Sequence, residues 1–521
     1  MQTPWLARFS GRTAGLGLFV AALLSAATIA SLRGPKGWPM ASIALGLAWA
    51  LGVWWSRPDP DGVEPPARSP LAAVLLLAAT TFFTAWHSQP TVTVNDGYGW
   101  DGLQYHAIYQ FIGTGEFTQR PIFPFHQRLG VPAIASFLPL PERSAFLVLG
   151  FAFYAAALGL LARFWLVRRS LRADLVVAAC GWLCLHWISP LRAGVCYPIN
   201  IDASTLFFDA AFFAMLWSPR LVRLLPLVAL VAALFKESAL LTAGLWLAST
   251  AILSVVREGP RRDALRRRLP LLLAAVLAAL LAKTLAGSLI TPRLLVTESA
   301  AATLARWIQT RADHPLQLVR LLSTFVNAYG GWLLVPLAAL SARPSVAPVA
   351  SSDDDLDDGH LLLWLALWIG VTFISGSDLS RFAWQAAPVA LTLALSTLQR
   401  RAPGSALALT LTSLGFVRLF TAVPSPSEGH LMPADDYEGA YSWMMETAHY
   451  SLVAAWAVFM RVARSAVPTA TRMSSKPGPV APSPQPSKRR RKPRRLACRW
   501  APEALAKGDS TLPPQLLSGQ S

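Results

Sequence analysis

Apolar segments of about 20 residues recur along most of the sequence, and this pattern limits the possible folds more than any other feature. The hydrocarbon core of a bilayer is about 30 Å thick, so one such segment crosses it as a helix. The segments are too long and too uniformly apolar for the alternating strands of a membrane barrel. We therefore predict an all-α fold, a polytopic transmembrane helical bundle of about 12 to 14 spans.

The composition agrees with this prediction. Charged residues make up 14% of the chain and hydrophobic residues 54%, whereas a soluble domain has about 25% charged residues. A water-soluble class is therefore excluded. The predicted spans are 14 to 32, 38 to 55, 70 to 87, 144 to 166, 173 to 189, 200 to 218, 221 to 236, 239 to 256, 269 to 290, 318 to 340, 361 to 376, 383 to 399, 404 to 422 and 448 to 463.

Lysine and arginine divide the loops into two sets. Short loops rich in these residues stay in the cytoplasm, so alternate loops should be basic. The basic set comprises Arg168, Arg169 and Arg172; Arg220 and Arg223; Arg257, Arg261, Arg262 and Arg266 to Arg268; and Arg400 and Arg401. The N-terminus and the C-terminal tail are accordingly predicted to be cytoplasmic. Residues 221 to 256, basic at both ends, are predicted to form a hairpin that turns at Lys236 and Glu237.

Two groups depart from this division. Arg33 and Lys36 fall in a predicted outer loop, and an acidic run from Asp353 to Asp358 falls in a predicted inner loop. Acidic residues contribute little to the rule, so the predicted sidedness stands.

The C-terminal region has a different composition. From Pro468 it is rich in Pro, Ser and basic residues, which is typical of disorder. We predict a transmembrane domain over residues 1–466 and a disordered basic tail over 467–521. The basic run at 488–495 suits anionic lipid at the inner leaflet, or it is a solvated segment that fixes topology. Nucleic acid is not expected as a partner of a membrane protein.

The longest predicted outer loop, residues 88–143, mixes aromatic and polar residues as short interfacial helices do. Asp96 and Asp101 are each followed by glycine, which suits a turn. Alternatively, the two carboxylates accept a proton from a hydroxyl or hold a divalent metal, Mg²⁺ or Mn²⁺. The same loop also contains Tyr105, His106, Arg120, Pro124, His126 and Arg128.

A second group of charged residues lies at the start of the span near 200. Asp202 and Asp209 stand seven residues apart, on one helical face, so Asp209 would lie about 10 Å deeper. Ionisable residues at such depth face the protein interior or a cavity and are functional candidates. The alternative is an internal ion pair of Asp209 with Arg192 or Lys236.

Two further groups complete the charged residues that are predicted at the outer face. They are Lys236 with Glu237 and, later in the chain, Asp378 with Arg381, which alternatively pair with each other at helical spacing. The Lys/Arg rule and the span lengths place all four groups on the same face, which favours a single site.

The order of these motifs resembles that of the bacterial GT-C class of integral membrane glycosyltransferases. The resemblance covers residues 90 to 385: an Asp-Gly with a nearby Tyr, an Arg before a Pro-containing segment (Arg128 to Pro132), the Lys236-Glu237 hairpin and a Gly-Ser-Asp-x-x-Arg at 376 to 381. It implies a bacterial inner membrane protein that uses a polyprenyl-phosphate sugar donor.

The resemblance also implies roles for individual residues. Asp101 would be the base or a metal ligand, and Asp96 is the second choice. Arg128, Lys236 and Arg381 would neutralise the donor phosphate. The remaining residues assigned to substrate binding are Tyr105, Asp202, Glu237 and Asp378.

Three functions follow as hypotheses. The leading one is transfer of a sugar from the lipid phosphate to an acceptor hydroxyl at the periplasmic face. The main rival is a transporter or flippase for a lipid-linked glycan, which would need buried charges near mid-membrane. The third is a membrane scaffold whose working part is the basic tail.

Overall fold

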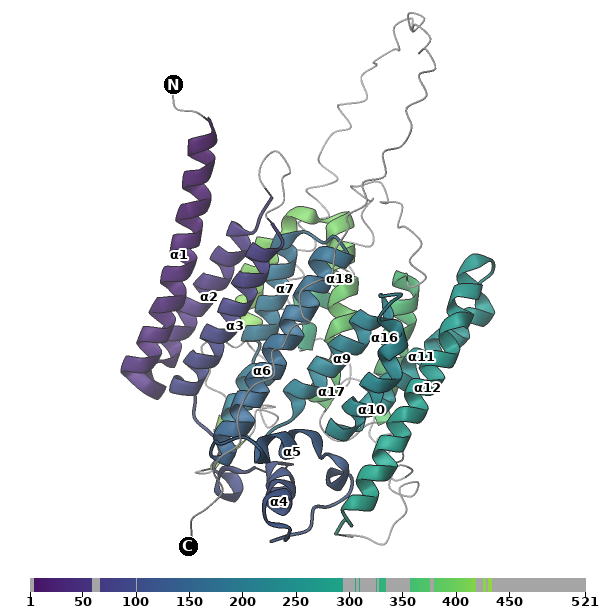
Figure 1. Cartoon of the computed structure of the whole chain (residues 1–521). Coiled ribbons are helices and arrows are strands. Elements are labelled where there is room, and N and C mark those ends of the chain that lie inside the picture. The colour runs from purple at the N-terminus through teal and green to yellow at the C-terminus, as the bar shows by residue number, and fades with distance from the viewer. Residues whose placement is uncertain are drawn as a thin grey trace, which may run out of the picture. The chain divides into compact units, whose positions relative to one another are not determined.

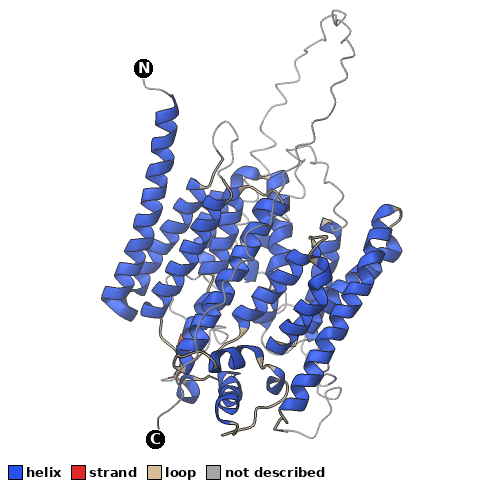
Figure 2. Cartoon of the chain, viewed as in Figure 1, coloured by secondary structure: helices blue, strands red, loops and turns tan. Residues whose placement is uncertain are grey.

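The computed structural model describes residues 4–58, 66–99, 101–293, 357–374 and 379–417, together with 305, 309, 325, 328–333, 425–427 and 430–432. The chain divides into two units, Met1–Ala466 and Val467–Ser521. The predicted basic tail lies outside the described residues. The first unit is a helical bundle, which confirms the predicted all-α fold (Figures 1 and 2).

The helices follow one another closely along the chain. The first half contains α1 (Pro4–Arg33), η1 (Gly34–Gly37), α2 (Trp38–Trp55), α3 (Arg68–Ser88), η2 (Val94–Gly97), α4 (Asp101–Thr114), η3 (Phe125–Gln127), α5 (Gly130–Ser136), α6 (Glu142–Arg163), the π-helical η4 (Phe164–Arg168), α7 (Ala173–Leu185) and α8 (Pro190–Cys196). The second half contains α9 (Asp202–Leu216), η5 (Val222–Leu224), α10 (Leu225–Phe235), α11 (Ser238–Val256), α12 (Pro260–Leu289), α16 (Asp358–Ile374), α17 (Leu379–Gln385), α18 (Ala387–Arg401), η6 (Pro403–Ser405), α19 (Ala406–Phe416) and the paired strands β1 (Ser425–Ser427) and β2 (His430–Met432).

Six stretches of the described residues are long and apolar enough to cross a membrane. They are Ala14–Trp55, Arg68–Ser88, Glu142–Arg168, Ala173–Cys196, Ser238–Val256 and Pro260–Leu289. The first of them contains both α1 and α2, which pack side by side (Figure 1). Val222–Phe235 and Asp358–Thr372 are shorter apolar helices. The chain is thus a multi-pass membrane protein. The count of 12 to 14 spans stays a prediction, since the predicted spans at 318–340 and 448–463 fall mostly or wholly outside the described residues.

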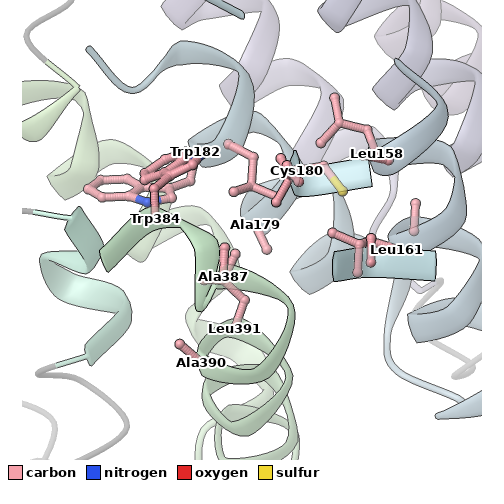
Figure 3. Packing of buried hydrophobic residues seen from close by; sticks show 14 of the residues in the cluster. Leu158, Leu161, Ala179, Cys180, Trp182, Trp384, Ala387, Ala390 and Leu391 are labelled. Atoms are coloured by element: carbon pink, nitrogen blue, oxygen red, sulfur yellow. The ribbon is translucent and has the colours of Figure 1, made fainter. Parts of the chain in front are cut away.

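The bundle has α7 at its centre, and every residue of that helix is buried. Figure 3 shows Ala179 and Trp182 of α7 facing Trp384 and Ala387, at α17 and the start of α18. The indole N–H of Trp182 donates to a backbone carbonyl at 3.1 Å. Ala179 and Ala387 have small side chains and let the helices approach closely, which is how helices associate within a bilayer. Cys180 and Cys184 are buried in the same core, as free thiols.

Ion pairs join the basic loops at one end of the bundle. Arg257 lies 2.5 Å from Asp357, Arg169 lies 3.2 Å from Asp358, and Arg400 also pairs with Asp358. The loops that follow α6, α11 and α18 therefore meet at one end, as the Lys/Arg pattern predicts. These contacts also explain why part of the acidic run lies among basic loops: two of its carboxylates neutralise arginines from three helices.

The long loop between α3 and α6 covers the opposite end of the bundle. Its helices α4 and α5 lie across the ends of the longer helices (Figure 1). They are held by a second hydrophobic core that contains Tyr105, Val131, Phe146, Ile199 and Phe235. The first residues of α6 and α9 and the last residues of α10 lie at this core, so these helix termini are brought together next to α4 and α5.

Candidate functional site

Arg128 is the most heavily bonded charged side chain at this end of the bundle. It follows η3 and is only 6% exposed. Its Nε donates to Glu237 Oε2 at 2.8 Å, and a second guanidinium nitrogen pairs with the other carboxylate oxygen. Nη1 donates to the Tyr105 hydroxyl at 2.7 Å, and the guanidinium lies 4.2 Å from the centre of the Phe125 ring. Such a two-pronged contact fixes both partners in orientation.

Both members of this pair are charged at neutral pH. Burial opposes the charge of Arg128, but Tyr105, Glu237 and Asp101 outweigh it and raise the pKa of the guanidinium. Burial would likewise raise the pKa of Glu237, yet the charge and hydrogen bonds of Arg128 lower it to about 2. The Glu237 side chain is 36% exposed, and its pairing with Arg128 keeps the carboxylate ionised.

A second ion pair lies beside the first. Lys236 Nζ donates to Asp202 Oδ1 at 2.7 Å, with the two side chains 10% and 11% exposed. Asp202 is the first residue of α9, and its N–H donates to the Asn200 side-chain oxygen at 2.7 Å. Lys236 has an extended backbone between α10 and α11. At the predicted hairpin turn, Lys236 therefore pairs with the start of α9, whereas Glu237 pairs with Arg128.

Asp101 begins α4, one turn before Tyr105, and a carboxylate at a helix N-terminus is favoured by the helix dipole. The next N–H, of Gly102, donates to the Tyr197 hydroxyl at 2.7 Å and fixes the start of the helix. Burial raises the pKa of the Tyr105 hydroxyl well above its ordinary value, and the charges of Asp101 and Asp202 raise it further. Both carboxylates therefore act on the hydroxyl that Arg128 holds.

These contacts bring charged side chains from separate segments of the chain together in one cluster. Its members are Asp101, Tyr105, Arg128, Asp202, Lys236 and Glu237. The cluster lies at the end of the bundle opposite the basic loops.

Asp96 is placed elsewhere. It is exposed and has a left-handed backbone, with φ of 55°. Its backbone carbonyl accepts a hydrogen bond from Arg143, whose guanidinium lies 5.2 Å from the Tyr98 ring centre. The adjoining Gly97 has φ of +83°, which only glycine adopts readily. These features match the turn interpretation of Asp96.

Asp209 lies deeper along α9 and is buried. Thr242 donates a hydrogen bond to one of its carboxylate oxygens at 2.8 Å, and the other oxygen has no hydrogen-bond partner among the described residues. Arg192 instead donates to the backbone carbonyls of Leu185 and Val417, at 2.8 and 2.7 Å. The structure thus gives Asp209 a threonine hydroxyl in place of the predicted ion pair.

The Gly-Ser-Asp-x-x-Arg motif at 376 to 381 lies largely outside the described residues. Asp378 lies outside the described residues, and so does the side chain of Arg381, although its backbone belongs to α17. Among the residues that the structure describes, no group of three or more His, Cys, Asp or Glu could hold a metal ion. The carboxylates of the charged cluster share their surroundings with cations, which disfavours a divalent ion.

Lys283 joins the cluster although sequence reasoning did not select it. It lies on α12, is 7% exposed, and its Nζ is 3.9 Å from Glu237 and 3.4 Å from the carbonyl of Gln127. The available signal was a lone lysine within an apolar span, since such residues face the protein interior or a cavity.

An apolar recess lies among α3, α6 and α8. It has about 310 Å³ of empty space, including part that is open to the surroundings. Residues of α3, α6 and α8 line it, including Phe82, Phe151 and Gly194, and so do Asn200 and Ala203, which flank Asp202 in the chain. An amphiphile with its polar group at the cluster would find apolar surface here.

Comparison with known proteins adds no identification: no protein-family model matches the chain, and no curated protein matches its sequence.

Proposed function

We propose that the chain is a membrane glycosyltransferase of the GT-C type, which moves a sugar from a polyprenyl-phosphate donor to an acceptor hydroxyl. The observation that carries this proposal is the charged cluster. Asp101, the first residue of α4, lies one helical turn before the tyrosine whose hydroxyl is bonded to Arg128, and Lys236 donates to Asp202 in the same cluster. Sugar transfer from a lipid phosphate needs a proton acceptor and cations within one site.

The reaction is a single displacement. The acceptor hydroxyl attacks the anomeric carbon, and Asp101 takes the hydroxyl proton as the new C–O bond forms. The bond from the anomeric carbon to the phosphate oxygen breaks, and the lipid phosphate leaves with the electron pair. Cations held at the cluster oppose the charge that develops on this leaving group. Attack from the face opposite to the phosphate inverts the anomeric centre.

The apolar recess supports a lipid-linked donor. A polyprenyl chain needs apolar surface near the polar site, and the lining of the recess includes Asn200 and Ala203, which flank Asp202 in the chain. Its aromatic lining, which includes the stacked Phe82 and Phe151 with ring centres 4.6 Å apart, suits an unsaturated hydrocarbon.

We place the site at the periplasmic face of a bacterial inner membrane, since the basic loops lie at the other end of the bundle and basic loops stay in the cytoplasm. The basic tail would then lie in the cytoplasm and bind anionic lipid.

One observation favours the rival hypothesis, a transporter or flippase of a lipid-linked glycan. Asp209 is a buried carboxylate within the bundle that has an oxygen without a hydrogen-bond partner among the described residues. Such a group suits an ion or proton path. A transporter would depend on Asp209, whereas the transferase depends on Asp101.

Asp101→Asn tests the proposal. In vesicles supplied with a polyprenyl-phosphate sugar and an acceptor, the variant should lose sugar transfer by at least about 100-fold, because the amide cannot take the proton. Asp96→Asn is the matched control and should retain activity. Transfer by Asp101→Asn at the wild-type rate would refute this role. Loss of lipid translocation in Asp209→Asn, with no transfer by the wild type, would favour the transporter.

A further inference from the structure

The cations of the charged cluster differ in how well their charge is balanced. Arg128 has two hydrogen bonds to Glu237 and one to Tyr105, and Lys236 donates to Asp202 at 2.7 Å. Their donors are largely engaged within the protein. A ligand that binds either cation has to compete with a carboxylate already in place.

The positive charge of Lys283 is poorly balanced by neighbouring anions. Its nearest polar contacts are the carbonyl of Gln127, at 3.4 Å, and Glu237, whose carboxylate at 3.9 Å lies beyond hydrogen-bond distance. The charged groups that act on it are Glu237 and Arg128, and Arg128 already takes both oxygens of that carboxylate. Two cations thus share one anion, and Lys283, whose ammonium has three donors, is only 7% exposed as a residue. Buried charges are normally paired, so this one calls for an anion.

His126 is a second buried polar side chain near Lys283, whose charge acts on its imidazole. Its side chain is 3% exposed, and its Nδ1 has no hydrogen-bond partner among the described residues. Burial and the charge of Lys283 lower the pKa of the imidazole, so the ring is neutral at neutral pH. A neutral imidazole still carries one N–H that can donate to an anion.

Gly287 brings these groups together. It lies one helical turn after Lys283 on α12, and so on the same face. A methyl group at this glycine would lie 3.0 Å from the Gln127 amide nitrogen and 3.7 Å from His126 Nε2. The lysine, the histidine and the glutamine therefore meet where α12 passes the loop at 125–128.

We propose that Lys283 and His126 bind an oxygen of a phosphate group, as an anion subsite of the charged cluster. The ammonium supplies charge and donors, and the imidazole supplies one further donor. The inference rests on the proposed function only for the lipid that carries the phosphate. A transporter of a lipid phosphate would need the same subsite.

Binding of a phosphate-bearing amphiphile to Lys283→Gln tests the proposal. The full chain in detergent micelles is titrated with polyprenyl phosphate, with the polyprenol of equal length, and with inorganic phosphate. The variant should bind polyprenyl phosphate at least about tenfold more weakly, the loss expected for one hydrogen bond between charged groups. Polyprenol binding should not change. Lys36→Gln, which removes one exposed positive charge from η1 at the same end of the bundle, is the matched control and should stay within about twofold.

Each outcome decides one question. Competition by inorganic phosphate in the wild type, lost in Lys283→Gln, would support the subsite and show that a free anion suffices. Equal affinity of wild type and Lys283→Gln for polyprenyl phosphate would overturn it. Without ligand, Lys283→Gln should unfold at a temperature no lower than the wild type, whereas a purely structural ion pair predicts a lower one. Wild-type phosphate binding without sugar transfer would refute the proposed function and leave the subsite standing.

Discussion

Glu237 is the residue on which the charged cluster depends. It accepts both hydrogen bonds from Arg128, 109 positions earlier in the chain, and it is the carboxylate nearest to Lys283. Its position two residues after the end of α10 lets one side chain connect the loop at 125–128, the hairpin turn and α12. A single short turn therefore sets the spacing of two cations that come from distant segments.

Lys236 allows a prediction at this scale. Lys236→Gln leaves Asp202 buried without its counter-ion, and removal of one partner of a buried pair costs about 3 kcal/mol. The variant should therefore unfold at a clearly lower temperature in detergent. The double variant Lys236→Gln with Asp202→Asn should recover most of this loss, because no unpaired charge remains. An additive loss in the double variant would contradict the pairing.

At the scale of elements, the cluster requires that α5 and α10 pack closely. Gly130, at the start of α5, lies against the ring of Phe235 at the end of α10, where an added methyl group would come within 2.4 Å. Charged residues of the cluster lie two positions from this contact in the sequence: Arg128 precedes Gly130, and Glu237 follows Phe235. The contact between the helices therefore sets the distance across the Arg128 and Glu237 pair.

Gly130→Ala should push α5 and α10 apart. Overpacking of this kind costs about 1 to 3 kcal/mol, and activity should fall with stability because the charged pair is pulled apart. Gly113→Ala is the matched control, since nothing lies within 4 Å of a methyl group there. Thermal unfolding and the transfer assay together check the prediction. Wild-type stability and transfer in Gly130→Ala would show that the packing is not needed.

At the scale of the whole molecule, ion pairs gather at both ends of the bundle, and they have a different role at each end. At the basic end, Asp357 and Asp358 neutralise arginines from three loops, which ties α16 to its neighbours. At the other end, α4 and α5 cover the charged cluster and the second hydrophobic core. One end is thus held together by ion pairs between loops, and the other forms the candidate site.

Cysteine labelling tests this arrangement in the membrane. Thr114 is exposed at the end of α4, and Arg220 is exposed in the loop between α9 and α10. In a Cys498→Ser background, Thr114→Cys should react with a membrane-impermeant maleimide on intact bacterial cells. Arg220→Cys should react only after permeabilisation. Cys180, Cys184 and Cys196 are buried and should stay unlabelled. The reverse pattern would place the candidate site in the cytoplasm.

The sequence by itself determined the class of the molecule and the grouping of its loops. Apolar run length and the distribution of Lys and Arg are local properties of the sequence. They determine, segment by segment, which stretches cross a bilayer and which loops stay in the cytoplasm. The same reasoning selected Asp101, Arg128, Asp202, Lys236 and Glu237, because charges beside apolar spans collect at the helix ends.

Only the tertiary structure decided which of these charges touch. It paired Arg128 with Glu237, gave Asp209 a threonine partner, set Asp96 apart in a turn and brought Lys283 to the cluster. Each outcome depends on how a helix is rotated about its axis and on how far a side chain reaches. Both are fixed by packing between segments that lie far apart in the chain, so no local pattern contains them.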